Sequence, residues 1–286
     1  MAEMGAKMPW SIWFRIQAKA LCQAIPVAFL IVVEGKDMYY RSTWQVTHLH
    51  PSKFETGDVV SLCNRWYTLP TWGHKLYSLT SKALLKSCWD DVGVIVVKDG
   101  KPHLLYCDFE GAKCTPLEDF LATRVPRGAA VRKLNKDSSI PPLSPHIANL
   151  FIEEVQKRPP QPWYLFRASM RGGQEHKLYE TCVQINAQTV KVRNMMRRSV
   201  SREAIRDQQE TLKNLNSMKE YVTSYVDYDG VFRLFNGSLV ASFLASYGLL
   251  DREIPAPYRY VPQDFAHDPP FKSATTLEEP VVFFKD

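Results

Sequence analysis

A short, uninterrupted apolar run, VGVIVV at Val92–Val97, constrains the fold of this 286-residue chain more than any other segment. A brief, largely β-branched run of this kind is typical of a strand. The turn Lys98–Lys101 and a second apolar run, His103–Phe109, follow directly and predict a hairpin. Further strands are predicted near Val59 and over Ala129–Leu134. This part of the chain therefore predicts a small antiparallel sheet or half-barrel of three to five strands.

Helices are predicted around this sheet, which gives an α+β chain. The segment Ser144–Lys157 opens with Ser as a helix N-cap and Pro at the first helical position. The segment Gln184–Val222 is polar, contains no Pro or Gly, and should be helical. A third helix is predicted over Gly237–Tyr247, with Gly248 as its C-cap. A shorter helix is predicted at Lys75–Lys86, and a short helix or a turn at Pro116–Ala122.

The first 50 residues are predicted to form an extension, with a helix followed by a strand at Met38–Val46. The run Ala20–Val33 carries no charge, but its 14 residues fall short of the ~20 that cross a bilayer as a helix. Snorkelling of the flanking basic residues would extend the apolar span back to Trp10. Two interpretations stay open: membrane contact through Trp10–Val33, and a helix that packs on protein.

Positive charge is concentrated in one segment. Arg167–Lys219 holds 11 Lys or Arg residues against 5 Asp or Glu, and this excess equals the net charge of +6 for the whole chain. Such a segment could meet an anionic partner, or it could be a solvated basic helix. Nucleic acid is not the expected partner, because no aromatic stacking motif accompanies the charge.

The cysteines and histidines show no metal-binding pattern. The six cysteines include no CxxC pair, so reduced thiols in an intracellular compartment are predicted. His48 and His50 form an HxH pair, which is a weak signal, and neither a metal nor a cofactor is predicted. The segment Pro255–Asp286 has six prolines in 32 positions, which predicts a tail that wraps a surface and does not form a core.

Several stretches form an ordered set: TGDVVSL at Thr56–Leu62, DVGVIVV at Asp91–Val97, PLEDFL and AAVRKL within Pro116–Leu134, and FNGSLVASFLASYGLL at Phe235–Leu250, followed by IPAPYRYVPQDF at Ile254–Phe265. In this order the set resembles the permuted papain-like hydrolases of the NlpC-type cell-wall peptidase superfamily. The resemblance implies a permuted papain-like fold, with a small antiparallel sheet or half-barrel packed on helices.

The resemblance also implies a division of the chain. Residues 1–50 would be an N-terminal extension, and residues 51–265 a papain-like domain. A basic helical insertion would interrupt this domain at about 167–225. Residues 266–286 would be a Pro-containing C-terminal tail.

In that family a cysteine begins the helix and a histidine lies on the strand. The helix dipole favours the thiolate, and the imidazole handles the proton. Here Asn236 stands at the cysteine position and Asp91 at the histidine position. An amide cannot ionise or attack, although it makes a good N-cap, and Asp91 is expected to be anionic. The resemblance therefore implies a lost dyad with two vestigial positions and no catalytic residue.

The third position of the family's triad falls within Tyr106–Asp108. Ser238 follows Asn236 by two residues and is expected to cap or pack its helix. The paired Asp90 and Asp91 are typical of a turn that binds backbone N–H groups. The implied cleft would be lined by Asp91, Tyr106, Asp108, Asn236 and Ser238. As a hypothesis, Asp91 and Asn236 face each other across this cleft, hydrogen-bonded, and hold an extended peptide or an acyl chain.

The sequence thus predicts a pseudoenzyme, a non-catalytic structural subunit that binds other protein subunits of a larger intracellular assembly. If the apolar N-terminal segment lies in a bilayer, a membrane complex such as one of the mitochondrial inner membrane is expected. If it does not, a cytoskeletal or ribonucleoprotein assembly fits equally well. One alternative is an active thiol hydrolase or acyltransferase with a displaced nucleophile, which predicts a reactive cysteine near a histidine. The other is a lipid- or peptide-binding module that uses the vestigial cleft, which predicts a co-purifying ligand.

Overall fold

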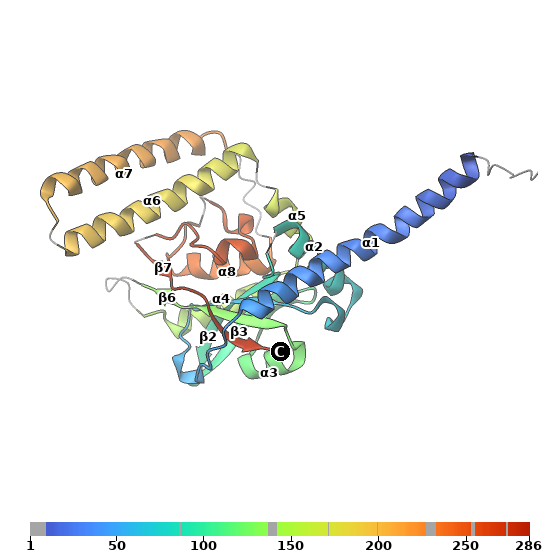
Figure 1. Cartoon of the computed structure of the whole chain (residues 1–286). Coiled ribbons are helices and arrows are strands. Elements are labelled where there is room, and N and C mark those ends of the chain that lie inside the picture. Colours follow the sequence, from blue (N-terminus) through green and yellow to red (C-terminus); the bar gives the residue numbers. More distant parts are fainter. Residues whose placement is uncertain are drawn as a thin grey trace, which may run out of the picture. The chain divides into compact units, whose positions relative to one another are not determined.

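The computed structural model describes residues 10–85, 87–136, 142–170, 172–198, 200–226, 233–252, 255–272 and 274–286, with residues 10–25 described by their backbone alone. The chain divides into two compact units, one up to Thr43 and one from Trp44 to Asp286. The first unit is a single long helix, and the second carries the sheet and the candidate site (Figure 1).

Helix α1 spans Trp10–Thr43, so the predicted strand at Met38–Val46 is wrong. Side-chain hydroxyl groups close the helix end, since Ser42 Oγ donates to the carbonyl of Tyr39 at 2.6 Å and Thr43 Oγ1 to that of Tyr40 at 2.7 Å. These bonds satisfy carbonyls that lack a helical partner, which outweighs the weak β preference of the aromatic residues. In the described part of the chain, no helix is long and apolar enough to span a bilayer.

In the described residues of the second unit, six antiparallel strands form one sheet in the order β4-β3-β2-β1-β5-β8 (Figure 1). The strands are β1 (Val59–Cys63), β2 (Asp91–Lys98), β3 (Lys101–Asp108), β4 (Gly111–Pro116), β5 (Gly128–Arg132) and β8 (Val281–Lys285). The predicted hairpin is confirmed as β2 and β3, and the predicted strands near Val59 and Ala129 as β1 and β5.

Both faces of this sheet are covered, which explains why the central strand β2 has an uninterrupted apolar run at Val92–Val97. Alternate side chains point to opposite faces, so Val92, Val94 and Val96 enter one core and Ile95 enters the other. Helix α3 (Leu117–Arg124) covers the Ile95 face through Leu117 and Phe120. Helices α4 (Pro145–Gln156) and α8 (Asn236–Ser246) belong to the core on the other face.

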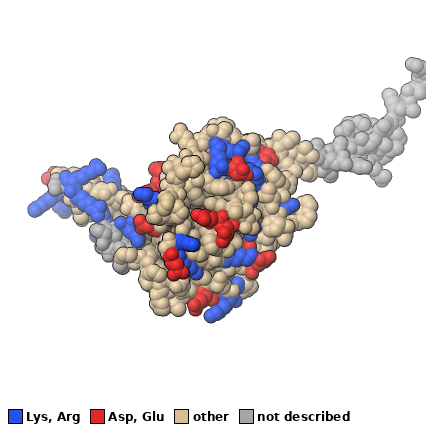
Figure 2. All heavy atoms as spheres, turned by 90° about the horizontal axis from the view of Figure 1, so that it is seen from below, with Lys and Arg blue, Asp and Glu red and all other residues tan. Residues whose placement is uncertain are grey.

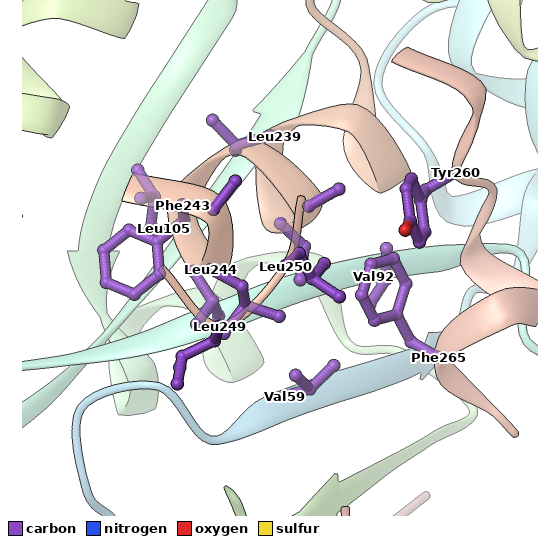
Figure 3. Close-up of a cluster of buried hydrophobic side chains, with 14 of the residues drawn as sticks. Val59, Val92, Leu105, Leu239, Phe243, Leu244, Leu249, Leu250, Tyr260 and Phe265 are labelled. Carbon is purple, nitrogen blue, oxygen red and sulfur yellow. The ribbon is translucent and has the colours of Figure 1, made fainter. Parts of the chain in front are cut away.

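Helix α8 lies at the centre of the larger core. Its side chains from Asn236 to Ala245 are all buried, and Leu239, Phe243 and Leu244 pack over Val92 and Leu105 of the sheet (Figure 3). A helix that is apolar all round is expected in such a fully enclosed position. The prediction of a helix in this segment is confirmed, and Gly248, at φ 73°, follows its end in the left-handed conformation that glycine tolerates.

Helices α6 (Gly173–Arg197) and α7 (Arg202–Thr223) lie side by side as an antiparallel hairpin (Figure 1). The single helical segment predicted from Gln184 is therefore two helices. The interruption coincides with Ser201, whose Oγ accepts a hydrogen bond from the backbone N–H of Ala204 and so caps the start of α7.

The C-terminal segment contributes to the core, so the expectation that it only wraps a surface is wrong. Phe265, Phe271 and Leu277 are buried, and β8 pairs with β5 at the edge of the sheet. Buried Arg132 binds this segment, because its guanidinium group donates to the carbonyls of four of its residues and contacts the Asp268 carboxylate. Those carbonyls belong to Phe265, His267, Leu277 and Glu278. The prolines shape the path of the segment without excluding its apolar residues from the interior.

The remaining elements are short apart from one helix, α2. They are η1 (Pro51–Lys53), η2 (Trp66–Thr68), α2 (Trp72–Leu85), β6 (Leu134–Asn135), α5 (Tyr164–Ser169), η3 (Pro257–Arg259), η4 (Pro262–Phe265) and β7 (Thr276–Leu277). Helix α2 lines the candidate site that is described next. The described chain combines helices with an antiparallel sheet, as the sequence predicted for the fold class.

Candidate functional site

The candidate site lies at the end of the sheet where β2 begins and β3 ends, beside the first turn of α8. Asp91 is the first residue of β2 and Asn236 the first residue of α8. The Asn236 Nδ2 group donates a hydrogen bond to Asp91 Oδ1. The structure therefore brings Asp91 and Asn236 into direct contact, as the hypothesis from the sequence required.

Asp91 is not the anion expected from the sequence. Desolvation by burial, with the neighbouring Asp90 charge second, raises the pKa of Asp91 to about 8. Its Oδ1 also accepts the backbone N–H of Val92 at 2.7 Å, which offsets only part of the shift. At neutral pH the group is therefore mostly a protonated carboxylic acid, and its contact with Asn236 joins two neutral polar groups.

The adjoining Asp90 links neighbouring elements through its hydrogen bonds. Its Oδ1 accepts the backbone N–H of Asn64 at 2.8 Å, and its Oδ2 accepts the Ser78 hydroxyl at 2.5 Å and the Asn64 amide at 3.3 Å. These bonds join the ends of β1 and β2 to helix α2. The predicted role of the Asp pair in binding backbone N–H groups is confirmed for both residues.

The start of α8 is capped by Ser238 rather than by Asn236. Ser238 Oγ accepts the backbone N–H of Phe235 at 2.9 Å, and Phe235 is the N-cap residue. The prediction that Ser238 caps the helix is confirmed, while the prediction that Asn236 is the N-cap is wrong. Because its hydroxyl group is engaged in this turn, Ser238 does not line the cavity that the other predicted residues share.

Tyr106 and Asp108 lie on β3 and reach the same cavity. Asp108 Oδ2 accepts hydrogen bonds from Arg124 Nη2 at 2.8 Å and from Lys113 Nζ at 2.9 Å. The Arg124 guanidinium group also lies 5.9 Å from the centre of the Tyr106 ring. Lys113 and Arg124 both pair with the Asp108 carboxylate. Its negative charge is therefore balanced by these two cations and is not directed at Asp91.

His74 is the site residue that the sequence did not indicate. It lies on α2, 8% exposed, with its ring 4.7 Å from that of Phe109 and its Nδ1 in a 2.7 Å hydrogen bond with Thr71 Oγ1. Burial, followed by the Arg124 charge, lowers the pKa of His74, so the imidazole is neutral at pH 7. A single histidine just before the helix predicted at Lys75–Lys86 carries no motif, and its position next to β3 depends on the tertiary fold.

Cys107 lines the same cavity as Asp91 and Asn236, but its thiol is not activated. It is 2% exposed on β3, and burial, followed by the Asp108 and Asp91 charges, raises the pKa of Cys107 far above its usual range. A reactive cysteine requires the opposite shift, toward the thiolate. This thiol is therefore an apolar core group at physiological pH.

The cavity itself is small, with a volume of about 30 Å³. Pockets that bind small organic ligands are typically ten times larger or more, whereas a space of this size suits a water molecule or two. The lining residues are Asn64, Leu69, His74, Tyr77, Ser78, Asp90, Asp91, Tyr106, Cys107, Asp108, Phe109, Phe120, Arg124, Pro162 and Asn236. Bulky aromatic side chains thus fill most of the space between α2, β3 and α8.

The chemistry available here is hydrogen bonding between neutral and ion-paired groups. Among the described residues, no three His, Cys, Asp or Glu side chains converge on a point that could hold a metal ion. His50 of the HxH pair uses its Nδ1 to accept the backbone N–H of Ser52, at the start of η1.

No protein-family model matches the sequence, and no curated protein matches it significantly. Among solved structures, the chain is similar to metalloprotein yiiX from Escherichia coli O157:H7. The match is 19% identical and covers 39% of this chain and 54% of that chain, with a TM-score of 0.28. A TM-score of this size does not establish a shared fold.

Proposed function

We propose that this chain is a non-catalytic protein with a permuted papain-like domain, and that it serves as a structural subunit of a larger intracellular protein assembly. The observation that carries the proposal is the hydrogen bond between Asn236 and Asp91. The family resemblance places a nucleophile and its base at these two positions. An amide and a protonated carboxyl group can bind each other there, but they supply neither function.

The surroundings of this pair also favour a structural role. The Asp90 bonds and the Asp108–Arg124 ion pair tie α2, β1, β2, β3 and α3 together around the cavity. Burial of a satisfied polar network makes a fold specific, and it costs stability if one member is removed. A site of this kind holds the domain rigid, which suits a subunit whose role is to present surfaces to its neighbours.

The enzyme alternative requires an activated nucleophile elsewhere. Cys107 is the candidate nearest to a histidine in this cavity, and its raised pKa argues against it. The ligand-binding alternative requires space, and about 30 Å³ does not admit a peptide or an acyl chain without opening of the walls. Neither alternative therefore has a specific observation in its favour.

The test is native purification of the endogenous protein, followed by mass photometry and mass spectrometry of all components. A complex with stoichiometric partner subunits is expected, and the identity of the partners would give the compartment, with the mitochondrial inner membrane as the first to examine. A monomer without partners would refute the structural role. In parallel, an electrophilic cysteine probe should leave Cys107 unmodified in the native protein, and rapid labelling there would favour the enzyme.

A further inference from the structure

The outer end of the α6–α7 hairpin concentrates positive charge. Residues 191–206, here called the basic tip, contain six Lys or Arg residues and one acidic residue, Glu203. The side chains of Lys191, Arg198, Arg202 and Arg206 are exposed. Figure 2 shows Lys and Arg side chains gathered at one end of the molecule, over the connection between the two helices that Figure 1 places away from the sheet.

Hydrogen bonds hold the rest of the hairpin in place, so the basic tip has an ordered support. Asn186 Nδ2, in α6, donates to the carbonyl of Thr275 at 3.0 Å, which anchors the hairpin to the domain. Gln188 Nε2 then donates to Gln208 Oε1 at 2.9 Å and links α6 to α7 just before the tip. Among the described residues, no carboxylate lies within ion-pair distance of Arg198, Arg202 or Arg206.

Two apolar side chains lie among these cations. Met196, in the last turn of α6, is 51% exposed, and Val200, between α6 and α7, is 36% exposed. Basic residues around a small apolar tip match the headgroup region of a bilayer, where cations meet lipid phosphates and apolar groups reach the acyl boundary. Arginine also suits phosphate, because its planar guanidinium group can donate two parallel hydrogen bonds.

We propose that the basic tip binds the surface of an anionic phospholipid bilayer. A protein partner fits less well, because stable protein interfaces need about 800 Å² per partner with an apolar centre, and the described residues of the tip offer two exposed large apolar side chains. Single-stranded RNA fits less well, because residues 191–206 include no aromatic side chain for base stacking. The inference uses a surface separate from the candidate site and does not depend on the papain-like interpretation.

The test uses the full-length chain and vesicles of phosphatidylcholine with 30% phosphatidylserine, compared with pure phosphatidylcholine, in a sedimentation assay at about 150 mM salt. The variant R198E/R202E/R206E reverses three charges of the basic tip. Each basic side chain near an anionic bilayer strengthens binding about fivefold, so this variant should bind the anionic vesicles at least about 100-fold more weakly. The variant M196S/V200S should lose a smaller part of the binding.

The matched control is K53E/K101E/K157E, which reverses three exposed lysines outside the hairpin. It should bind the anionic vesicles within threefold of the unchanged chain. Circular dichroism and thermal melting should be the same for all variants. Equal loss in the tip and control variants would overturn the proposal, because the binding would then follow net charge alone.

Two further outcomes would assign the basic tip to another partner and overturn the proposal. The first is tip-dependent binding of a 20-nucleotide single-stranded RNA with no vesicle binding. The second is a tip variant that binds vesicles normally but is lost from the endogenous assembly. Because the vesicle assay does not require that assembly, its result is independent of the structural role proposed above.

Discussion

The Asp91 carboxyl group makes the stability of the domain depend on pH. Burial raises its pKa to about 8 in the folded chain, whereas an unfolded chain has the ordinary value of about 4. The folded state therefore holds one proton more than the unfolded state between about pH 4 and pH 8. The stabilisation is complete at the acidic end of this window and is lost as the pH rises through the folded pKa.

The substitution Asp91→Asn should remove this pH dependence, because an amide stays neutral and can still bond Asn236. Relative to the variant, the unchanged chain should lose roughly 3 to 4 kcal/mol of unfolding free energy between pH 5 and pH 8. Urea denaturation at several pH values measures this difference. Asp58, whose pKa burial raises to about 6, is present in both proteins, so its titration cancels. Parallel stability curves would show that Asp91 ionises as an ordinary surface carboxylate.

The sequence anticipated part of this site at the level of single residues. The order of motifs indicated that Asp91 and Asn236 belong together, although 145 positions separate them, and the structure confirms their hydrogen bond. The charge of Asp91 was predicted wrongly, because desolvation depends on the packing of α2, β3 and α8 around it. His74 was missed for the same reason, since no local pattern distinguishes a histidine that a distant strand will bury.

Among the elements, α8 depends on one glycine. A Cβ atom on Gly237 would lie 2.3 Å from the carbonyl oxygen of Tyr260 and 2.8 Å from Val261 Cα, so the backbone that connects η3 to η4 passes directly over this helix turn. Both contacts are with backbone, which cannot rotate away as a side chain can. Close approach of two backbones is a specific reason for glycine inside a helix, where it otherwise weakens the structure.

The substitution Gly237→Ala should therefore destabilise the domain by about 1 to 3 kcal/mol, the usual cost of overpacking, despite the better helix propensity of alanine. Thermal denaturation monitored by circular dichroism measures the change. Gly35 in α1 provides the control, because a Cβ there meets nothing within 4 Å. Gly35→Ala should leave the transition of the domain unchanged. An unchanged melting temperature for Gly237→Ala would exclude the close approach at Tyr260.

Arg132 links the C-terminal segment to the sheet, and its removal should be costly. Arg132→Met would keep much of the buried volume but leave four carbonyl groups without their donor, with an expected loss of about 3 kcal/mol or more. Arg158→Met is the matched control, because its pair with Glu154 is exposed on α4 and should be worth under about 1 kcal/mol. Urea denaturation of both variants makes the comparison. Equal losses would mean that the Arg132 bonds do not hold the segment.

Local elements were predictable where the signal lies within the element. The hairpin of β2 and β3 combines two apolar runs with the turn residues Asp99 and Gly100, and both strands are confirmed. By contrast, β8 joins the sheet through β5, about 150 residues earlier in the chain. A pairing over that distance leaves no periodicity in the tail itself, so its prolines suggested a surface segment. Helix α1 extends into the segment Met38–Val46, where a strand was predicted, because intrinsic β preference is weak without partner strands.

At the scale of the whole molecule, the two units differ in how they are stabilised. The four clusters of buried apolar residues are formed by Phe54 and residues that follow it, so these clusters lie in the second unit. Helix α1, in contrast, exposes apolar side chains at Val27, Phe29, Ile31 and Val32, two of them by about two thirds. Exposed apolar groups that recur along one segment are typical of a surface that meets a partner.

Removal of residues 1–43 should therefore separate folding from assembly. The remaining chain should keep one cooperative thermal transition, with its midpoint within a few degrees of that of the full chain, because the described core clusters lose no member. Recovery of the stoichiometric endogenous complex should fall at the same time. The control is the full chain carrying I31Q/V32Q, which keeps the helix but changes two of its exposed apolar side chains. It should melt normally and also recover fewer partners. A truncated chain that melts far lower or aggregates would show that α1 belongs to the folding core. Normal recovery of the complex by both proteins would show that α1 is not an assembly surface.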